Sequence, residues 1–88
     1  MTNAALNKAQ ATRLAAQGQN AIARVVYPAH SIYDGDTVFA LCSGQVETSP
    51  DAIGVLARHA AEEAIIDAVK SARTYGDYLS YQDRMKKL

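Results

Sequence analysis

The sequence predicts a mixed α/β (α+β) fold in which a helix, a strand and a second helix follow one another over 88 residues. Two alanine-rich segments, from Lys8 to Val25 and from Pro50 to Tyr75, carry apolar residues at helical spacing. Between them, the nearly continuous apolar run Thr37–Ser43 predicts a strand that is buried on both faces. Because one strand cannot form a sheet, we expect another chain or another copy of this chain to complete it.

The first helix has a clear beginning and a clear end in the sequence. Asn7 is a favourable N-cap, and Gln10, three residues later, can complete a capping box. Gly18 costs about 1 kcal/mol relative to alanine, but it allows a neighbouring segment to approach closely. Pro28 prevents the helix from continuing. The stripe that we expect to face the core consists of Ala11, Leu14, Ala15, Ala21, Ile22 and Val25.

The second helix begins at Ser49-Pro50-Asp51, which combines a serine cap, a proline in the first turn and an acid at the positive end of the helix dipole. We expect Gly44 to end the strand and Gly76 to end this helix after Tyr75. A last short helix capped by Asp77 would follow. The expected buried stripe consists of Ile53, Leu56, Ala57, Ala60, Ala64 and Ala68, widened by Ile65, Val69 and Ala72.

Composition excludes several classes of function. The formal net charge is zero, with nine basic and nine acidic residues, so no nucleic-acid partner is expected. Cys42 is the only cysteine, which excludes a disulfide framework and a Cys-rich zinc site, and we expect it to be a small buried thiol. No segment has the length of a membrane span or the core of a signal peptide, so we expect a cytoplasmic location without membrane contact.

Asp34-Gly35-Asp36, directly before the expected strand, is the most informative motif. Taken alone it predicts a tight turn whose acids cap their own backbone. A phosphotransferase would need these acids after a hydrophobic strand, and a calcium loop would need oxygen ligands where Val38 and Ala40 stand. The remaining possibility is general acid/base or amine-binding carboxylates that act beside a nucleophile from elsewhere.

The two histidines give weaker signals. His30 lies four residues before Asp34, so a metal site with both acids is conceivable, although three ligands on one loop lack a fourth. His59 is expected to be a partly exposed residue of the second helix.

The run from Ala23 to Leu41 resembles a signature of one peptidase family. That family contains L-aminopeptidase/D-esterase, the β-aminopeptidases and the nylon-oligomer hydrolases. Its members carry a similar run of Ala-Arg, a Pro-x-His-Thr segment and Asp-Gly-Asp-Thr before a Phe-Ala pair. The helix opening Leu6–Gln10 and the alanine-rich second helix are similar too, so the resemblance covers nearly the whole chain.

The resemblance implies an α–β–β–α sandwich made by a self-cleaving precursor. Cleavage in the family frees a serine or threonine at the start of the C-terminal subunit. Its hydroxyl attacks amides and esters, and its own amine helps as base. Asp34 and Asp36 match the acidic pair that supports this residue: Asp34 would orient the amine or relay protons, and Asp36 would complete the network. Other members have serine at the first position, and no metal or organic cofactor is implied.

The expected function follows from where the nucleophile would lie. In the family it begins a strand that leads into the equivalent of Thr2–Ala4, so it would precede residue 1. We therefore expect residues 1–88 to be a single domain, the C-terminal portion of the aminopeptidase fold without the nucleophile strand and inactive alone. The alternative is a stand-alone, self-associating interaction domain. A third reading is a small hydrolase in which removal of Met1 exposes Thr2 as the nucleophile.

Overall fold

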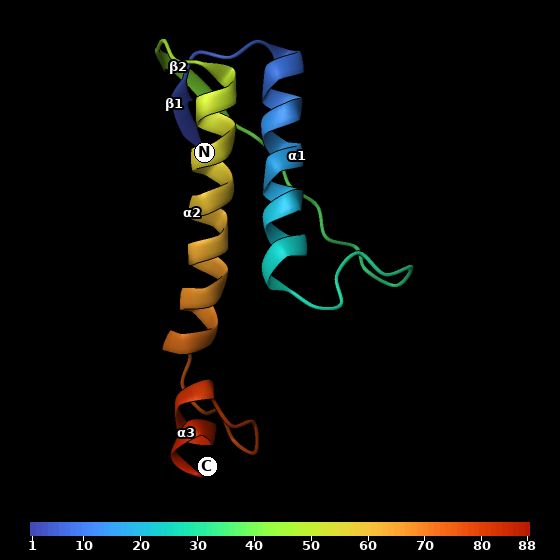
Figure 1. The fold of residues 1–88 in the computed structure, drawn as a ribbon, viewed down its shortest axis with the longest axis vertical. Helices are drawn as coiled ribbons and strands as arrows, with labels where there is room; N and C mark the ends of the chain where they lie inside the picture. Colours follow the sequence, from blue (N-terminus) through green and yellow to red (C-terminus); the bar gives the residue numbers. More distant parts are fainter.

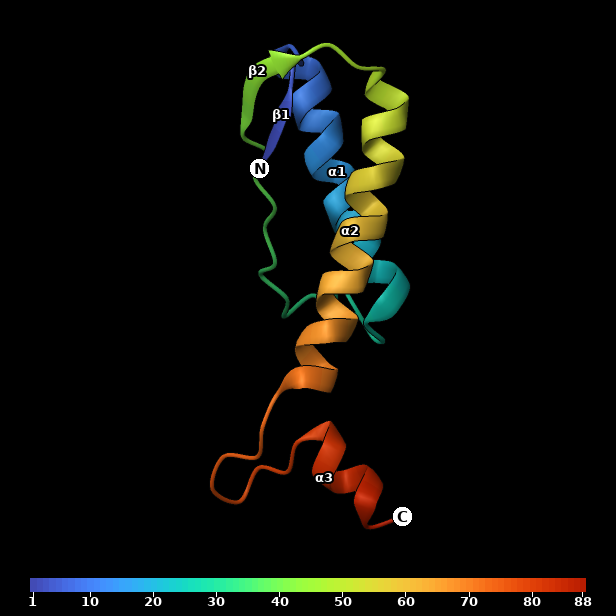
Figure 2. The ribbon, with the colours of Figure 1, turned by 90° about the vertical axis from the view of Figure 1, so that its left-hand side faces the viewer.

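A computed structural model of the chain describes residues 1–88 as two strands and three helices. The elements are β1 (Thr2–Ala4), α1 (Lys8–Val25), β2 (Cys42–Val46), α2 (Pro50–Ser71) and α3 (Tyr81–Lys86). The two long helices lie side by side, the strands lie next to their first turns, and α3 lies beyond the far end of α2 (Figures 1 and 2). This mixture of helix and strand confirms the α/β class. Neither long helix contains an apolar stretch that could cross a membrane.

The bounds and the cap of α1 are confirmed. The helix spans Lys8–Val25, and both halves of the capping box are present. Asn7 Oδ1 accepts a hydrogen bond from the Gln10 amide at 2.8 Å, while Gln10 Oε1 accepts one from the Asn7 amide at 3.0 Å. The cap therefore satisfies two amides that a helix start otherwise leaves unpaired.

The predicted end of α2 is wrong. The helix starts after Ser49, as expected, but it ends at Ser71. Gly76, with a φ of 57°, lies instead in a tight turn between Tyr75 and Tyr78, whose backbones exchange two hydrogen bonds of 2.9 and 3.1 Å. Glycine suits this turn because it adopts positive φ without steric cost.

The short last helix is present, but its cap was also predicted wrongly. Ser80, and not Asp77, caps α3, since its hydroxyl accepts a hydrogen bond from the Asp83 amide at 3.2 Å. Ser80 is buried, and Thr74 Oγ1 accepts its amide at 2.9 Å. The hydroxyl of Thr74 in turn donates to the carboxylate of Asp83.

The face of α2 that meets α1 differs from the predicted stripe by about one position. Gly54 is buried, and Ala57, Ala61 and Ile65 are partly buried, whereas Leu56 is 62% exposed. The alanines at 60, 64 and 68, which were assigned to the buried stripe, are exposed as well. Because alanine is frequent on every side of this helix, the sequence pattern identifies the contact face poorly.

The sheet contains a strand that the sequence analysis missed. β1 pairs in parallel with β2, with Thr2 opposite Cys42 and Ala4 opposite Val46. Parallel neighbours need a crossover, and α1 provides it. The strand was predicted at Thr37–Ser43, but the pairing falls on Cys42–Val46, because β1 is too short to bond residues further upstream. Gly44, which was expected to end the strand, lies inside it with a φ of 77°.

The chain by itself does not bury this region on both faces, and its burial by another chain or copy stays a prediction. Phe39 is 82% exposed and Leu41 is 62% exposed, while Cys42 is only partly buried. The whole chain has an accessible surface of 7068 Å², against about 5,000 Å² for a compact monomer of its mass. Its radius of gyration is 16.1 Å, against about 12 Å for a compact domain of this length. The chain thus exposes much apolar surface that a compact domain would bury.

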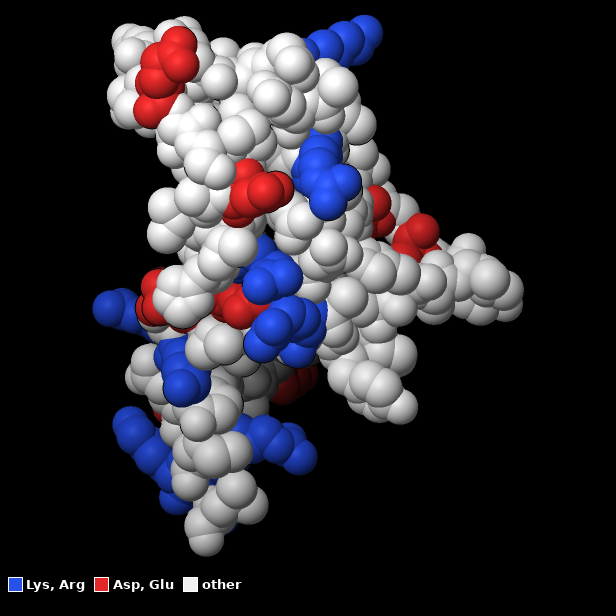
Figure 3. Space-filling model, turned by 45° about the horizontal axis from the view of Figure 1, so that its top comes forward, with Lys and Arg blue, Asp and Glu red and all other residues white.

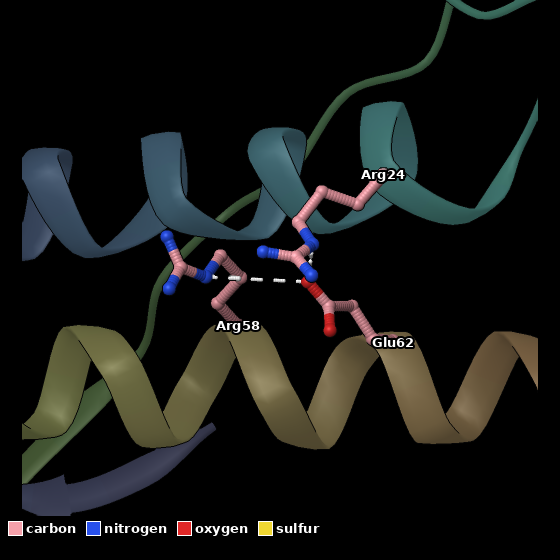
Figure 4. A network of polar contacts seen from close by, with 3 residues as sticks. All are labelled: Arg24, Arg58 and Glu62. Atoms are coloured by element: carbon pink, nitrogen blue, oxygen red, sulfur yellow. Dashed lines mark ion pairs between the residues drawn. The ribbon is translucent and has the colours of Figure 1, made fainter.

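A charged cluster bridges the two long helices (Figure 4). Arg24 Nε of α1 lies 2.8 Å from Glu62 Oε1 of α2, and Arg58 Nε lies 4.0 Å from the same oxygen. The Glu62 side chain is only 15% exposed. Its Oε1 accepts no hydrogen bond of good direction, so the contact is an ion pair rather than a charge-assisted hydrogen bond. Arg24 is largely exposed, and pairs of this kind contribute little stability.

Two glycines on facing elements predict opposite responses to alanine. A Cβ at Gly18 would lie 2.8 Å from Val38 Cγ1, so Gly18→Ala must displace the segment before β2. A Cβ at Gly54 would lie 3.4 Å from the flexible Gln17 side chain, which can move. At both sites the change from glycine to alanine also stabilises the helix by about 1 kcal/mol through the higher helix propensity of alanine. We expect Gly54→Ala to raise the thermal midpoint and Gly18→Ala to lower it or leave it unchanged, as measured by circular dichroism. A larger gain at Gly18 would contradict the close approach of Val38.

Candidate functional site

The acidic motif lies in a loop that projects from the end of α1. The acidic loop (residues 30–36) follows the Tyr27–Pro28 bend and precedes the extended segment that runs back to the sheet (Figure 1). All of its side chains are exposed. None of the four main cavities of the chain includes Asp34 or Asp36 in its wall. As it stands, the site is therefore an open surface loop and not a pocket.

Asp34 uses one carboxylate oxygen to close its own turn. Oδ2 accepts a hydrogen bond from the Ser31 amide at 2.8 Å, and the Asp34 amide donates to the Ser31 carbonyl at 3.0 Å. The Ser31 hydroxyl also accepts the Tyr33 amide at 3.3 Å. This is the backbone-capping turn that aspartate favours. No hydrogen bond or ion pair within the chain engages the other oxygen of Asp34.

Asp36 is anchored through its backbone, and its carboxylate is free. The Gln19 side-chain amide donates to the Asp36 carbonyl at 3.1 Å. No hydrogen bond or ion pair within the chain engages the Asp36 carboxylate. Close by, the Thr37 hydroxyl donates to the Gly35 carbonyl at 3.3 Å. The loop therefore presents one partly engaged and one free carboxylate to whatever approaches it.

His30 holds the opposite end of the acidic loop. Its Nε2 lies 3.2 Å from the Gln19 carbonyl oxygen, and because a carbonyl only accepts, Nε2 carries the proton in this contact. His30 has a φ of 57°, a conformation that histidine adopts more readily than most residues. No group of three or more His, Cys, Asp or Glu residues lies close enough together to hold a metal ion. His59 pairs instead with Glu63 on the exposed face of α2, at 3.0 Å.

Thr2 lies in the sheet, away from the acidic loop. Its amide donates to the Leu41 carbonyl at 2.9 Å, and its hydroxyl accepts the Ala4 amide at 3.2 Å. It lines a cavity of about 190 Å³ with Leu14, Phe39 and other mainly apolar residues. Thr2 and Leu41 thus meet at one end of the extended segment, while Asp36 precedes its other end (Figures 1 and 2). The chain itself does not bring Thr2 and the two acids together.

One residue of this region was missed by the sequence analysis. Gln19 was not among the candidate residues of the sequence analysis, yet it contacts both His30 and Asp36. Both contacts join residues more than ten positions apart in the sequence, so no local motif indicates them. The contact of one glutamine with both ends of the loop depends on how the loop folds back on the helix.

The charges around the helices do not form a second site. Lysine and arginine side chains are interspersed with acids over the upper and middle part of the face in Figure 3, and they predominate only toward its lower end. A cavity of about 180 Å³ between the first halves of α1 and α2 is lined by Arg13, Arg58 and Asp51 among others. Because the Asp51 carboxylate lies among these arginines, the cavity has no simple preference for anions.

Comparison with known proteins assigns the region to a family. The model of peptidase family S58 matches residues 1–80. Proteins of Mycobacterium bovis and Mycobacterium tuberculosis, each named an uncharacterized aminopeptidase, are 43% identical over 70 residues, which is 80% of this chain. An uncharacterized aminopeptidase of Mycobacterium leprae is 47% identical over 51 residues, which is 58% of this chain.

The match covers only a small part of these relatives. The aligned segment is 20% of the M. bovis and M. tuberculosis proteins and 14% of the M. leprae protein. No solved structure matches the chain. The family that the sequence motif indicated is thus confirmed. The roles of Thr2, Asp34 and Asp36 stay predictions.

Proposed function

The chain belongs to peptidase family S58, and on that premise we propose that residues 1–88 form the C-terminal portion of an N-terminal-nucleophile aminopeptidase or amidase. In this proposal the nucleophile strand lies outside these residues. The chain alone is inactive, and the complete site hydrolyses an amide at an amino-terminal residue. Asp34 and Asp36 support the amine of the nucleophile, and no cofactor takes part.

The observation that carries this proposal is the apolar surface beside an incomplete sheet. The sheet has two strands, of three and five residues, and both outer edges are unpaired. Phe39 and Leu41, just before β2, are exposed, although their sequence is typical of a buried strand. Open edges and apolar faces of this kind are normally covered by further strands. A neighbouring part of the same fold, an α–β–β–α sandwich, would cover them and extend the sheet.

The position of Thr2 also supports a nucleophile from elsewhere. The Thr2 nitrogen donates to the Leu41 carbonyl, so Thr2 is held beside the sheet and not beside the acidic loop. The acidic loop lies at the far end of the extended segment from the two strands. A nucleophile placed beside the acidic loop by another segment would meet a free carboxylate on Asp36. The proposal therefore assigns the acids, and not Thr2, to the site.

The test is an assay of three proteins on a panel of aminoacyl and β-aminoacyl p-nitroanilides. They are the purified chain, its Thr2→Ala variant, and a chimaera in which the chain replaces the matching segment of the M. tuberculosis relative. We expect turnover by the chimaera and none by the chain alone. Turnover by the chain that Thr2→Ala abolishes would overturn the proposal. So would an inactive chimaera beside an active, unaltered relative.

The exposed apolar surface beside β2 also fits a second candidate function, in which the chain is an interaction domain that associates with itself. Two copies could cover the exposed apolar residues of each other beside β2. Analytical ultracentrifugation of the purified chain separates the two candidates. A stable homodimer with no activity in the chimaera would favour self-association, and a monomer that is active in the chimaera would favour the peptidase site. In either case a cytoplasmic location stays a prediction.

A further inference from the structure

We propose that Gln19 is the positioning residue of the acidic loop and fixes it between two anchors on α1. The inference rests on the proposed function for its catalytic meaning, but its structural content can be tested without any activity. It begins from the two long-range hydrogen bonds that connect this loop to a helix.

The two anchors come from different parts of one residue. The side-chain amide of Gln19 donates to the Asp36 carbonyl, and the backbone carbonyl of Gln19 accepts from His30 Nε2. These contacts hold the first and last residues of the acidic loop (residues 30–36). The hydrogen bonds between Ser31 and Asp34 then close the turn between them.

The loop has little else to hold it. Its side chains are exposed, and Ile32 and Tyr33 at its tip are 92% and 91% exposed. Apolar burial therefore contributes almost nothing to its conformation. A loop without burial is ordered by its hydrogen bonds, and each lost anchor increases the conformational freedom of the chain between them. Gln19 is partly buried on α1, so its own side chain is better fixed than the loop it holds.

The consequence for the site is positional. The carboxylates of Asp34 and Asp36 can assist a nucleophile only if they are held close to one geometry. Asp34 is oriented by its turn, but the carboxylate of Asp36 is oriented only by its backbone, which Gln19 holds. Gln19 therefore acts through Asp36 and does not touch the reacting atoms.

The chain offers well-matched variants for the test. Gln19→Glu keeps the size of the side chain but replaces the amide donor by a carboxylate, which cannot donate to the Asp36 carbonyl. Gln17→Ala is the control for Gln19→Ala, because Gln17 lies on the same helix and its side chain makes no hydrogen bond. His30→Asn removes the second anchor while keeping a residue type that tolerates the positive φ at this position.

The primary measurement is amide hydrogen exchange of Ser31 and Asp34 in the chain itself, with α1 amides near the buried Ala21 as internal reference. We expect Gln19→Glu, Gln19→Ala and His30→Asn to accelerate exchange of the two loop amides by about three- to tenfold, the effect of one lost hydrogen bond. Gln17→Ala should leave them unchanged. Unchanged loop exchange in both Gln19 variants, or equal acceleration in Gln17→Ala, would overturn the proposal.

A second measurement connects the anchor to catalysis. In the chimaera, Gln19→Glu should lower kcat about tenfold or more with KM nearly unchanged, since the substrate still binds while the acids are displaced. An active chimaera whose kcat is insensitive to Gln19→Glu would show that Gln19 does not position the acids. An inactive chimaera would contradict the proposed function, and the exchange measurement would still decide whether Gln19 holds the loop.

Discussion

Replacing Ala21 by aspartate is expected to unfold the helical pair. Ala21 has no exposed surface, and it is one of only four buried residues in the chain. A carboxylate there would lose its hydration, because this position has no access to solvent. An uncompensated buried charge costs at least about 3 kcal/mol. A chain with so small a core has little stability to lose.

The measurement is a thermal melt followed by far-ultraviolet circular dichroism. Ala16→Asp is the matched control, because Ala16 is exposed on the same helix and suffers the same loss of helix propensity, less than about 1 kcal/mol. We expect a cooperative melt for Ala16→Asp and none for Ala21→Asp. Similar midpoints for the two variants would mean that α1 does not bury Ala21 in solution.

Replacing Asp36 by asparagine is expected to have the largest effect on activity in the chimaera. Its carboxylate is free of partners within the chain, whereas the Gln19 contact that places it is made by the backbone. Asp36→Asn therefore removes the charge and leaves the anchor intact. Loss of a carboxylate that supports the catalytic base can lower turnover as much as loss of a base itself, by about 10²- to 10⁴-fold. We expect a fall of that order in kcat/KM on the best p-nitroanilide.

Asp34→Asn provides the internal comparison. An asparagine side-chain oxygen can still accept the Ser31 amide, so the turn should persist. Because other members of the family have serine at the position of Asp34, we expect Asp34→Asn to lose less activity than Asp36→Asn. Equal losses would show that both carboxylates act in the reaction. Full activity of Asp36→Asn would remove Asp36 from the site altogether.

Local chemistry explains which parts of the fold could be predicted from the sequence. The bounds of α1 and its capping box depend on Asn7, Gln10 and the helical spacing of apolar residues, all within one segment. The start of α2 at Ser49 and the acidic turn at Asp34 are equally local. The family signature also lies in one continuous run, which is why the sequence identified it and the comparisons confirmed it.

What the tertiary structure decided depends on partners that are distant in sequence. β2 falls on Cys42–Val46 because β1 is there to bond it, and a strand has no boundary until its neighbour is placed. The face of α2 was predicted one position away, because alanine on every side gives a weak pattern and contact with α1 selects the side.

The sequence by itself determined the family, the two long helices and the presence of two carboxylates on a turn. Only the folded chain showed that Gln19 holds both ends of that turn and that Thr2 lies in the sheet instead. Hydrogen bonds across more than ten residues arise from the path of the backbone in space, which residue types alone do not specify.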